Sequence, residues 1–240
     1  MNLLISGISG TMGQKIYELA SKDDYWKEID GIDANKSVSE IEFIPNVAID
    51  FSHPTAIDQI LNYCVDNSIP LVIGTTGFEV DKQEKINKAS EKIAILQTSN
   101  MSLGMNLMFA LVKEVASILK NKVDIEVIEA HHNRKVDAPS GSAISIIKSI
   151  EEGLGETRNH AHGRTGQCPR EKGEIGVHAI RGGNIVGIHE AQFINDLESI
   201  KIIHEAYDRS VFAEGALQGA KFLINKTNGM YSMKDVLNLK

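Results

Sequence analysis

The chain has little sulfur with which it could stabilise itself covalently. Cys64 and Cys168 are its only cysteines among 240 residues, and they lie far apart in no metal-ligand pattern. This scarcity excludes a disulfide framework, which small secreted domains use. We therefore expect the protein to work in a reducing cytoplasm.

The chain also lacks an excess of positive charge and a long apolar run. Twenty-five basic residues face 32 acidic ones, for a net charge of −7. Such a chain is poorly suited to bind nucleic acid or an anionic membrane through its overall field, although a local basic pocket is compatible with it. The longest apolar stretch, about 103–119, contains the charged residues Lys113 and Glu114. The N-terminal segment Met1–Ile5 lacks the basic residues with which a signal peptide begins. We expect neither a membrane span nor a signal peptide.

Hydrophobic residues make up 42% of the chain and charged residues 24%, which is typical of a soluble globular protein. In the first half, short apolar segments alternate with segments of helical spacing. This order predicts a parallel, doubly wound sheet. The expected strands are 3–5, 29–33, 47–51, 71–73 and 93–96, and the expected helices are 11–21, 56–66 and 79–88.

The pattern changes near Ser102, and the second half predicts a smaller α+β domain with a mixed or mostly antiparallel sheet. A polar stretch at 153–172 without periodicity predicts a long loop. The turn Arg181-Gly182-Gly183-Asn184 predicts a hairpin between two strands. The expected helices are 104–120, about a dozen residues from Gly141, and 212–224, and the expected strands are 123–130, 174–180, 185–193 and 199–207.

A glycine pattern between the first strand and the first helix indicates a dinucleotide site. Gly7 permits the tight turn, Gly10 lets the backbone approach a pyrophosphate, and Gly13 lets the helix pack on the sheet. An ordinary glycine-rich turn remains the alternative. Asp33 follows Gly13 by 20 residues, where a carboxylate would bind ribose hydroxyls and favour NAD over NADP. Lys36 is close enough to soften the repulsion of a 2′-phosphate, and an ordinary strand end is the alternative.

Two further strand ends carry small polar residues. Gly74-Thr75-Thr76-Gly77 and Thr98-Ser99-Asn100-Met101 each follow an expected strand. Since ligands bind at the carboxyl ends of parallel strands, these segments could approach a nicotinamide and bond its amide. A simple turn is the alternative for either segment.

The segment from Glu129 to Ser142 combines three chemical functions. His131 and His132 can move protons near neutral pH, and Lys135 supplies a cation or an acid. Pro139 and Ser140 mark the start of a helix, where the N–H groups of Gly141 and Ser142 would face an anion. A carboxylate held there would lie close to Lys135.

Other polar residues give weaker signals. His160 and His162 have no further placed ligands near them in the sequence, so we expect no metal site. We interpret Arg181 and its Gly182-Gly183 turn as structural. Arg209 follows a strand and could serve either an active site or the surface.

Taken together, these motifs resemble the dihydrodipicolinate reductase family of the diaminopimelate route to lysine, over nearly the whole chain. The segment containing His131, His132, Lys135, Pro139-Ser140-Gly141 is the most specific. The other matching segments are Gly7–Gly13, Asp50–Pro54, Val72–Phe78, Ser99–Asn106, Arg181–Gly187 and Phe212–Ala216.

The resemblance implies a reductase that uses NADH, NADPH or both, and no metal. It implies a cyclic dicarboxylate substrate and a homotetramer whose second domains pair their sheets. The dinucleotide domain would be 1–102 with 212–240, and the substrate domain 103–211. By resemblance, His131 is the catalytic histidine and Lys135 the proton donor, and the substrate residues are His132, Ser140, Gly141 and Ser142. The implied cofactor residues are Gly7, Ile8, Ser9, Gly10, Thr11, Met12, Asp33, Gly74, Thr75, Thr76, Thr98, Ser99, Asn100 and Met101.

The chain departs from the family pattern at three places. His53 stands where arginine is frequent, and Ala34 stands where a basic residue is frequent. Both departures weaken the expectation of a strong NADP preference. The stretch 35–45 is short, so the crossover there should be abbreviated. A dinucleotide sensor without turnover and an aspartate- or homoserine-type dehydrogenase are the two alternative functions.

Overall fold

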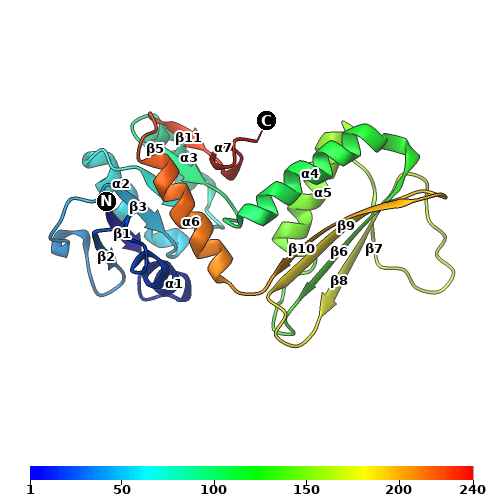
Figure 1. Ribbon diagram of the computed structural model, residues 1–240, viewed down its shortest axis with the longest axis horizontal. Helices are drawn as coiled ribbons and strands as arrows, with labels where there is room; N and C mark the ends of the chain where they lie inside the picture. Colours follow the sequence, from blue (N-terminus) through cyan, green and yellow to red (C-terminus); the bar gives the residue numbers. More distant parts are fainter. Residues whose placement is uncertain (240) are drawn as a thin grey trace. The chain divides into compact units, whose positions relative to one another are not determined.

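The computed structural model describes residues 1–239, which divide into two compact units (Figure 1). Unit 1 comprises Met1–Leu103 and Arg209–Lys240, and unit 2 comprises Gly104–Asp208. Unit 2 is therefore inserted into the sequence of unit 1.

Unit 1 contains a parallel six-stranded sheet in the order β11-β5-β4-β3-β1-β2. Its central strands are buried and mostly apolar, as expected for a parallel sheet with helices on both faces. The strands are β1 (Asn2–Ser6), β2 (Glu28–Ile32), β3 (Val47–Asp50), β4 (Leu71–Ile73), β5 (Ala94–Gln97) and β11 (Gly229–Tyr231). This Rossmann-like sheet confirms the predicted fold class, although the short strand β11 was not expected.

Alternating side chains of β1 separate the two layers of unit 1. Leu3 and Ile5 pack with α1 and α6, whereas Leu4 packs with α2 and α3. The connection between β2 and β3 contains only the short helix η1, in keeping with its short sequence. The helices are α1 (Thr11–Ala20), η1 (Val38–Glu40), η2 (Pro54–Ala56), α2 (Ile57–Asp66), α3 (Val80–Ser90), α6 (Ser210–Leu223) and α7 (Met233–Val236).

Unit 2 contains a mixed five-stranded sheet in the order β10-β9-β6-β8-β7. The pairs β6–β8 and β7–β8 are parallel, and β6–β9 and β9–β10 are antiparallel. One face packs against α4 and α5 through Val127, Ala191 and Phe193. The elements are α4 (Leu103–Leu119), η3 (Lys120–Lys122), β6 (Asp124–His131), α5 (Gly141–Leu154), β7 (His160–His162), β8 (Ile175–Arg181), β9 (Gly187–Ile194) and β10 (Ser199–Ala206).

Two expectations about unit 2 are wrong. Arg181–Asn184 does not close a hairpin, because β6 lies between β8 and β9 and the turn carries the chain across it. The segment 153–172 is not wholly irregular, because β7 pairs with β8 inside it. Arg170 and Arg164 hold the rest of this segment through ion pairs with Glu126 and Glu174. Backbone pairing and arginine contacts order the segment without any apolar pattern.

Within the described residues, none of the helices has the length and apolar content needed to cross a membrane.

Candidate active site and dinucleotide site

A buried carboxylate organises the polar end of the sheet in unit 2. Glu129 lies on β6, on the face covered by the helices, and is fully buried. Arg181, which lies opposite His131 on the neighbouring strand β8, donates two hydrogen bonds to the Glu129 carboxylate at 2.7 and 2.8 Å. Burial by itself raises the pKa of the Glu129 carboxyl, but Arg181 and His131 outweigh burial and bring this pKa below its usual value. Glu129 is therefore a stable anion, which fixes its neighbours.

His131 is the chief of these neighbours. Its Nδ1 lies 2.6 Å from Oε2 of Glu129, so Nδ1 carries a proton when the carboxylate accepts this hydrogen bond. The other ring nitrogen, Nε2, lies 3.3 Å from the position that a Cβ at Gly187 would take. Glycine on β9 therefore leaves space beside Nε2. The arrangement orients the imidazole and leaves Nε2 as the atom that can exchange a proton.

A second buried histidine, which the sequence did not single out, lies beside His131. His189 pairs with Glu129 across β6 and β9, and its ring packs edge-on to that of His131 at 5.1 Å between centroids. Its Nε2 lies 3.2 Å from Oγ of Ser140. Burial, and then the positive charge that His131 can carry, lower the pKa of His189 to about 4. At neutral pH His189 is therefore uncharged, and its Nε2 shares a hydrogen bond with the Ser140 hydroxyl.

The N-terminus of α5 is built around Ser140. Its Oγ accepts a hydrogen bond from the amide of Ala143, which makes it the N-cap, and its own amide donates to Oε1 of Glu129 at 3.1 Å. The side chain of Ser140 is thus engaged inside the protein. A Cβ at Gly141 would meet nothing within 4 Å, so the first turn of the helix is open to a ligand.

Lys135 lies in the loop that joins β6 to α5. Its ammonium forms an ion pair with Asp137 at 2.8 Å, and this pairing lowers the pKa of the Asp137 carboxyl. The loop is tied to the β8 end by two bonds, from Gly182 N to the His131 carbonyl at 2.9 Å and from Asn133 N to the Gly183 carbonyl at 3.2 Å. Arg181 also donates to the Asp137 carbonyl at 2.7 Å. The turn mistaken for a hairpin therefore supports the loop that carries Lys135.

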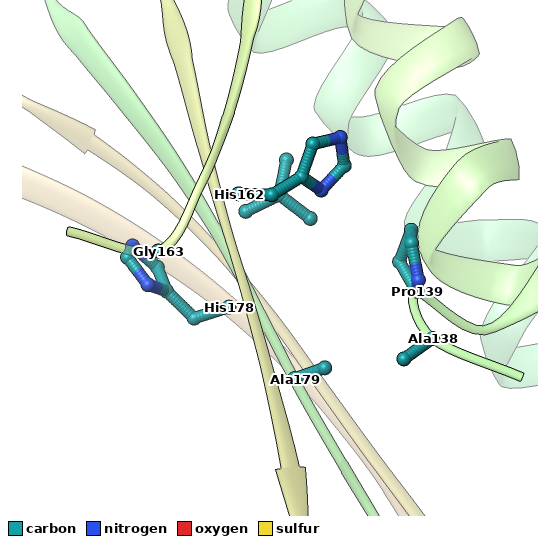
Figure 2. A pocket seen from close by; sticks show the side chains of 7 residues that line it. Ala138, Pro139, His162, Gly163, His178 and Ala179 are labelled. Carbon is teal, nitrogen blue, oxygen red and sulfur yellow. The ribbon is translucent and has the colours of Figure 1, made fainter. Parts of the chain in front are cut away.

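A cavity of about 540 Å³ lies beside this loop (Figure 2). Figure 2 shows His162 and Pro139 at its border, from β7 and from the start of α5. Neither His131 nor Lys135 lines it. The lining residues are Ala138, Pro139, His162, Gly163, Val177, His178 and Ala179. Among the described residues, no group of three or more histidine, cysteine or acidic side chains could hold a metal ion.

The glycine loop of unit 1 has a backbone that requires glycine at two positions. Gly7 has a φ of +83°, and a Cβ there would lie 2.4 Å from the Phe51 carbonyl oxygen. A Cβ at Gly13 would lie 2.1 Å from the Gly7 oxygen. Gly10 is the N-cap of α1 and offers no capping side chain. Only glycine fits at positions 7 and 13, and the first turn of α1 can take an anion in place of a cap.

Asp33 lies just after β2, next to the glycine loop. Its Oδ1 accepts a hydrogen bond from Asn35 N at 2.8 Å, and this bond, followed by one from the Ser9 side chain, lowers the pKa of the Asp33 carboxyl. The Asp33 carboxylate is thus held in place beside the glycine loop. Lys36 forms an ion pair with Asp30 at 2.5 Å. Its ammonium is therefore engaged with Asp30, while its charge also helps to lower the pKa of the Asp33 carboxyl.

The other proposed cofactor segments follow β4 and β5. Thr75 is buried, and its hydroxyl donates to Asp50, so its backbone is the part left for a ligand. Thr98 and Asn100 bond each other, and Met101 is buried in the core of unit 1. Ser9 and Thr11 are exposed in the glycine loop, whereas Ile8 and Met12 pack against the core.

Comparison with known proteins gives a consistent result. The 4-hydroxy-tetrahydrodipicolinate reductases of Alkaliphilus metalliredigens (strain QYMF) and Alkaliphilus oremlandii (strain OhILAs) are 62% and 61% identical over 239 residues, covering 100% of this chain and 100% and 99% of theirs. A dipicolinate-bound dihydrodipicolinate reductase structure from Paenisporosarcina sp. TG-14 has a TM-score of 0.75 at 20% identity, over 97% of both chains, and shares the fold. Residues 1–101 and 104–237 match the families described as dihydrodipicolinate reductase, N-terminus and C-terminus. The chain therefore belongs to the dihydrodipicolinate reductase family.

Proposed function

We propose that this protein reduces 4-hydroxy-tetrahydrodipicolinate to tetrahydrodipicolinate with NADH or NADPH, in the diaminopimelate route to lysine. Full-length identity of 62% to a reductase of that name supports the proposal. The observation that carries it is local. A histidine oriented by a buried carboxylate, a lysine and an open helix N-terminus occur together in one unit. In the proposal, unit 1 holds the dinucleotide and unit 2 holds the substrate.

His131 and Lys135 supply the acid–base chemistry in this proposal. Reduction removes the ring hydroxyl as water and consumes a proton, so a donor must face the ring. Nε2 of His131 can deliver a proton while Glu129 stabilises the ring in either state. Lys135 can deliver a proton or balance the charge of the substrate. Both assignments, with one residue as donor and the other as counter-charge, suit the geometry.

The first turn of α5 would bind the substrate carboxylates. Gly141 and Ser142 begin this helix, where backbone N–H groups and the helix dipole favour an anion. Lys135 and His132 belong to the loop just before it and would contribute further hydrogen bonds. Ser140 would contribute by capping α5, because its hydroxyl is bonded to the helix and to His189.

When bound, the reduced nicotinamide supplies the hydride. The residues of unit 1 suit such a dinucleotide, because the glycine loop leaves room for a pyrophosphate and Asp33 offers a ribose acceptor. A carboxylate at this place favours NADH, since it repels a 2′-phosphate. The segments Gly74–Thr76 and Thr98–Met101 would bind the remainder through their backbone.

A coupled assay tests the function. Pyruvate and aspartate semialdehyde are condensed by a dihydrodipicolinate synthase, and the absorbance of NADH or NADPH is followed after this protein is added. We expect a fall in absorbance that requires both condensing substrates. Dinucleotide binding without turnover would support a sensor instead. Turnover with aspartate or homoserine, and none with the condensed product, would support the other dehydrogenase class.

We also propose a homotetramer in which the open faces of the unit 2 sheets pair. Ile180 and Ile203 point away from the helix-covered face and are 51% and 58% exposed, and Ile128 and Ile188 lie on the same face. Exposed apolar patches of this kind mark interfaces. Light scattering should give four times the chain mass, and Ile203→Lys should reduce it. A monomeric mass for the wild-type protein would refute this assembly.

A further inference from the structure

A second buried carboxylate, in unit 1, has no place in the proposed chemistry. Asp50 ends β3 and is fully buried. Its Oδ1 accepts hydrogen bonds from the hydroxyls of Ser6 and Ser52, each at 2.6 Å, and its Oδ2 accepts one from Thr75 at 2.6 Å. Within residues 1–239 it forms no ion pair. Three hydroxyl groups therefore replace the water that this carboxylate lost on folding.

The direction of each hydrogen bond is fixed. The hydroxyl of Thr75 accepts from the amide of Ser52 at 3.0 Å, so its single proton is donated to Asp50. All three hydroxyls therefore act as donors, and the carboxylate acts only as an acceptor. An asparagine at position 50 would turn an NH₂ group toward at least one of these hydroxyls. That contact would place two donors face to face, and the hydroxyl would have to turn away.

The three donors lie at the carboxyl ends of three neighbouring strands. Ser6 ends β1 immediately before Gly7, Ser52 follows β3, and Thr75 follows β4. The backbone repeats the connection, because Phe51 N donates to the Ser6 carbonyl and Gly74 N donates to the Asp50 carbonyl. The carboxyl ends of parallel strands are where α/β proteins bind their ligands. Asp50 thus connects the strand ends from which the segments 7–12 and 74–76 begin. The proposed function assigns both segments to the dinucleotide.

Stability alone accounts poorly for a charge at this position. A buried carboxylate without a cation is costly, and an apolar side chain would fill the same space with less loss of hydration. The carboxylate does what an apolar group cannot, since it fixes three loops at hydrogen-bond distance. We propose that Asp50 is a positioning residue that holds the β1–α1 and β4–α3 loops at the spacing the dinucleotide requires. This inference rests on the proposed function, because it assumes that unit 1 binds NADH or NADPH.

The test measures NADH affinity by fluorescence titration, with urea unfolding measured in parallel. We expect Asp50→Asn to raise the dissociation constant for NADH at least about tenfold, the size expected for loss of hydrogen bonds to a charged group. Ser52→Ala removes one donor from a partly exposed residue and should raise it about threefold. Ser90→Ala, which removes a buried hydroxyl bond on α3, is the control for stability and should leave NADH affinity unchanged.

A structural role alone would lower stability in all of these variants and leave the affinity of the folded protein unchanged. Folded Asp50→Asn that binds NADH within twofold of the wild-type protein would overturn the inference. If Asp50→Asn does not fold, unchanged affinity in both Ser52→Ala and Ser6→Ala would overturn it equally. Wild-type protein that binds neither NADH nor NADPH would overturn the proposed function and this inference together. Wild-type binding with unaffected variants would overturn this inference alone.

Discussion

Acidification should destabilise this protein through His189. The loss of stability should begin at a pH above the one at which carboxylates begin to take up protons. The ring is buried between β6 and α5, and its pKa is lowered from 6.5 to about 4. In the unfolded chain the same ring binds a proton near pH 6.5. Lowering the pH through this window therefore adds a proton to the unfolded state while the folded state still excludes it, and stability falls.

The size of the effect follows from the two pKa values. Between pH 7.5 and pH 4.5 the difference amounts to about 2 to 3 kcal/mol of unfolding free energy, at roughly 1.4 kcal/mol for each unit. The Glu129 carboxyl also destabilises the protein as the pH falls, because its pKa is lowered on folding. Its effect begins only near pH 4.5, the pKa of this group in the unfolded chain. His204, whose pKa burial also lowers, adds to the loss in the same window as His189. A comparison of variants at position 189 removes both contributions.

Urea unfolding at half-unit steps from pH 7.5 to pH 4.5 provides the measurement. His189→Gln keeps a polar side chain that can bond the Ser140 hydroxyl and removes the titrating group. We expect the unfolding free energy of the wild-type protein to fall by about 2 to 3 kcal/mol more than that of His189→Gln over this range. Ser140→Ala is the matched control, since it removes the hydrogen bond and keeps the buried ring. It should be less stable at every pH but retain the wild-type pH dependence.

Parallel pH profiles for the wild-type protein and His189→Gln would refute the argument. They would mean that His189 binds a proton in the folded protein as easily as in the unfolded chain. The ring would then have to be hydrated or paired with a carboxylate in solution.

Three further outcomes are expected. His131→Gln and Lys135→Ala should each lower turnover in the coupled assay by about two orders of magnitude or more, as loss of a positioned acid–base group does, and near-normal turnover in both would contradict their roles. Gly141→Ala should leave thermal stability unchanged, because its Cβ meets nothing, but should raise KM for the cyclic substrate about tenfold if a carboxylate approaches there; an unchanged KM would exclude that contact. Asp33→Asn should improve binding of NADPH relative to NADH about fivefold in fluorescence titrations, because one negative charge near the 2′-phosphate is removed, and an unchanged ratio would place the ribose elsewhere.

The sequence predicted the strands of unit 1 except β11, because most of them contain a short apolar run next to a helix of regular spacing. It failed where strand pairing depends on distant residues. The Gly182-Gly183 turn has hairpin chemistry, yet the neighbour of β8 is β6, which lies far earlier in the chain. Local turn chemistry carries no information about which strand lies alongside. β7 was missed because His160–His162 has no apolar alternation and forms by backbone pairing alone.

For the candidate site, the sequence identified residues that occur in one contiguous motif and missed those brought in by register. His131, Lys135 and Gly141 lie in one segment, and motif spacing singled them out. His189 pairs with Glu129 across two strands, and only the register between β6 and β9 reveals it. Arg181 pairs with Glu129, and this partner could not be named without the sheet.

The insertion of unit 2 into the sequence of unit 1 dictates an order of events during translation. When residues 1–103 have left the ribosome, the nascent sheet still lacks α6, whose Ala216, Ala220 and Leu223 cover one of its faces. It also lacks β11, so the edge of β5 is unpaired. Unit 2 is continuous and can complete itself first. The apolar face around Leu96 therefore stays uncovered until about 120 further residues are made, and this interval is when the chain most needs protection from aggregation.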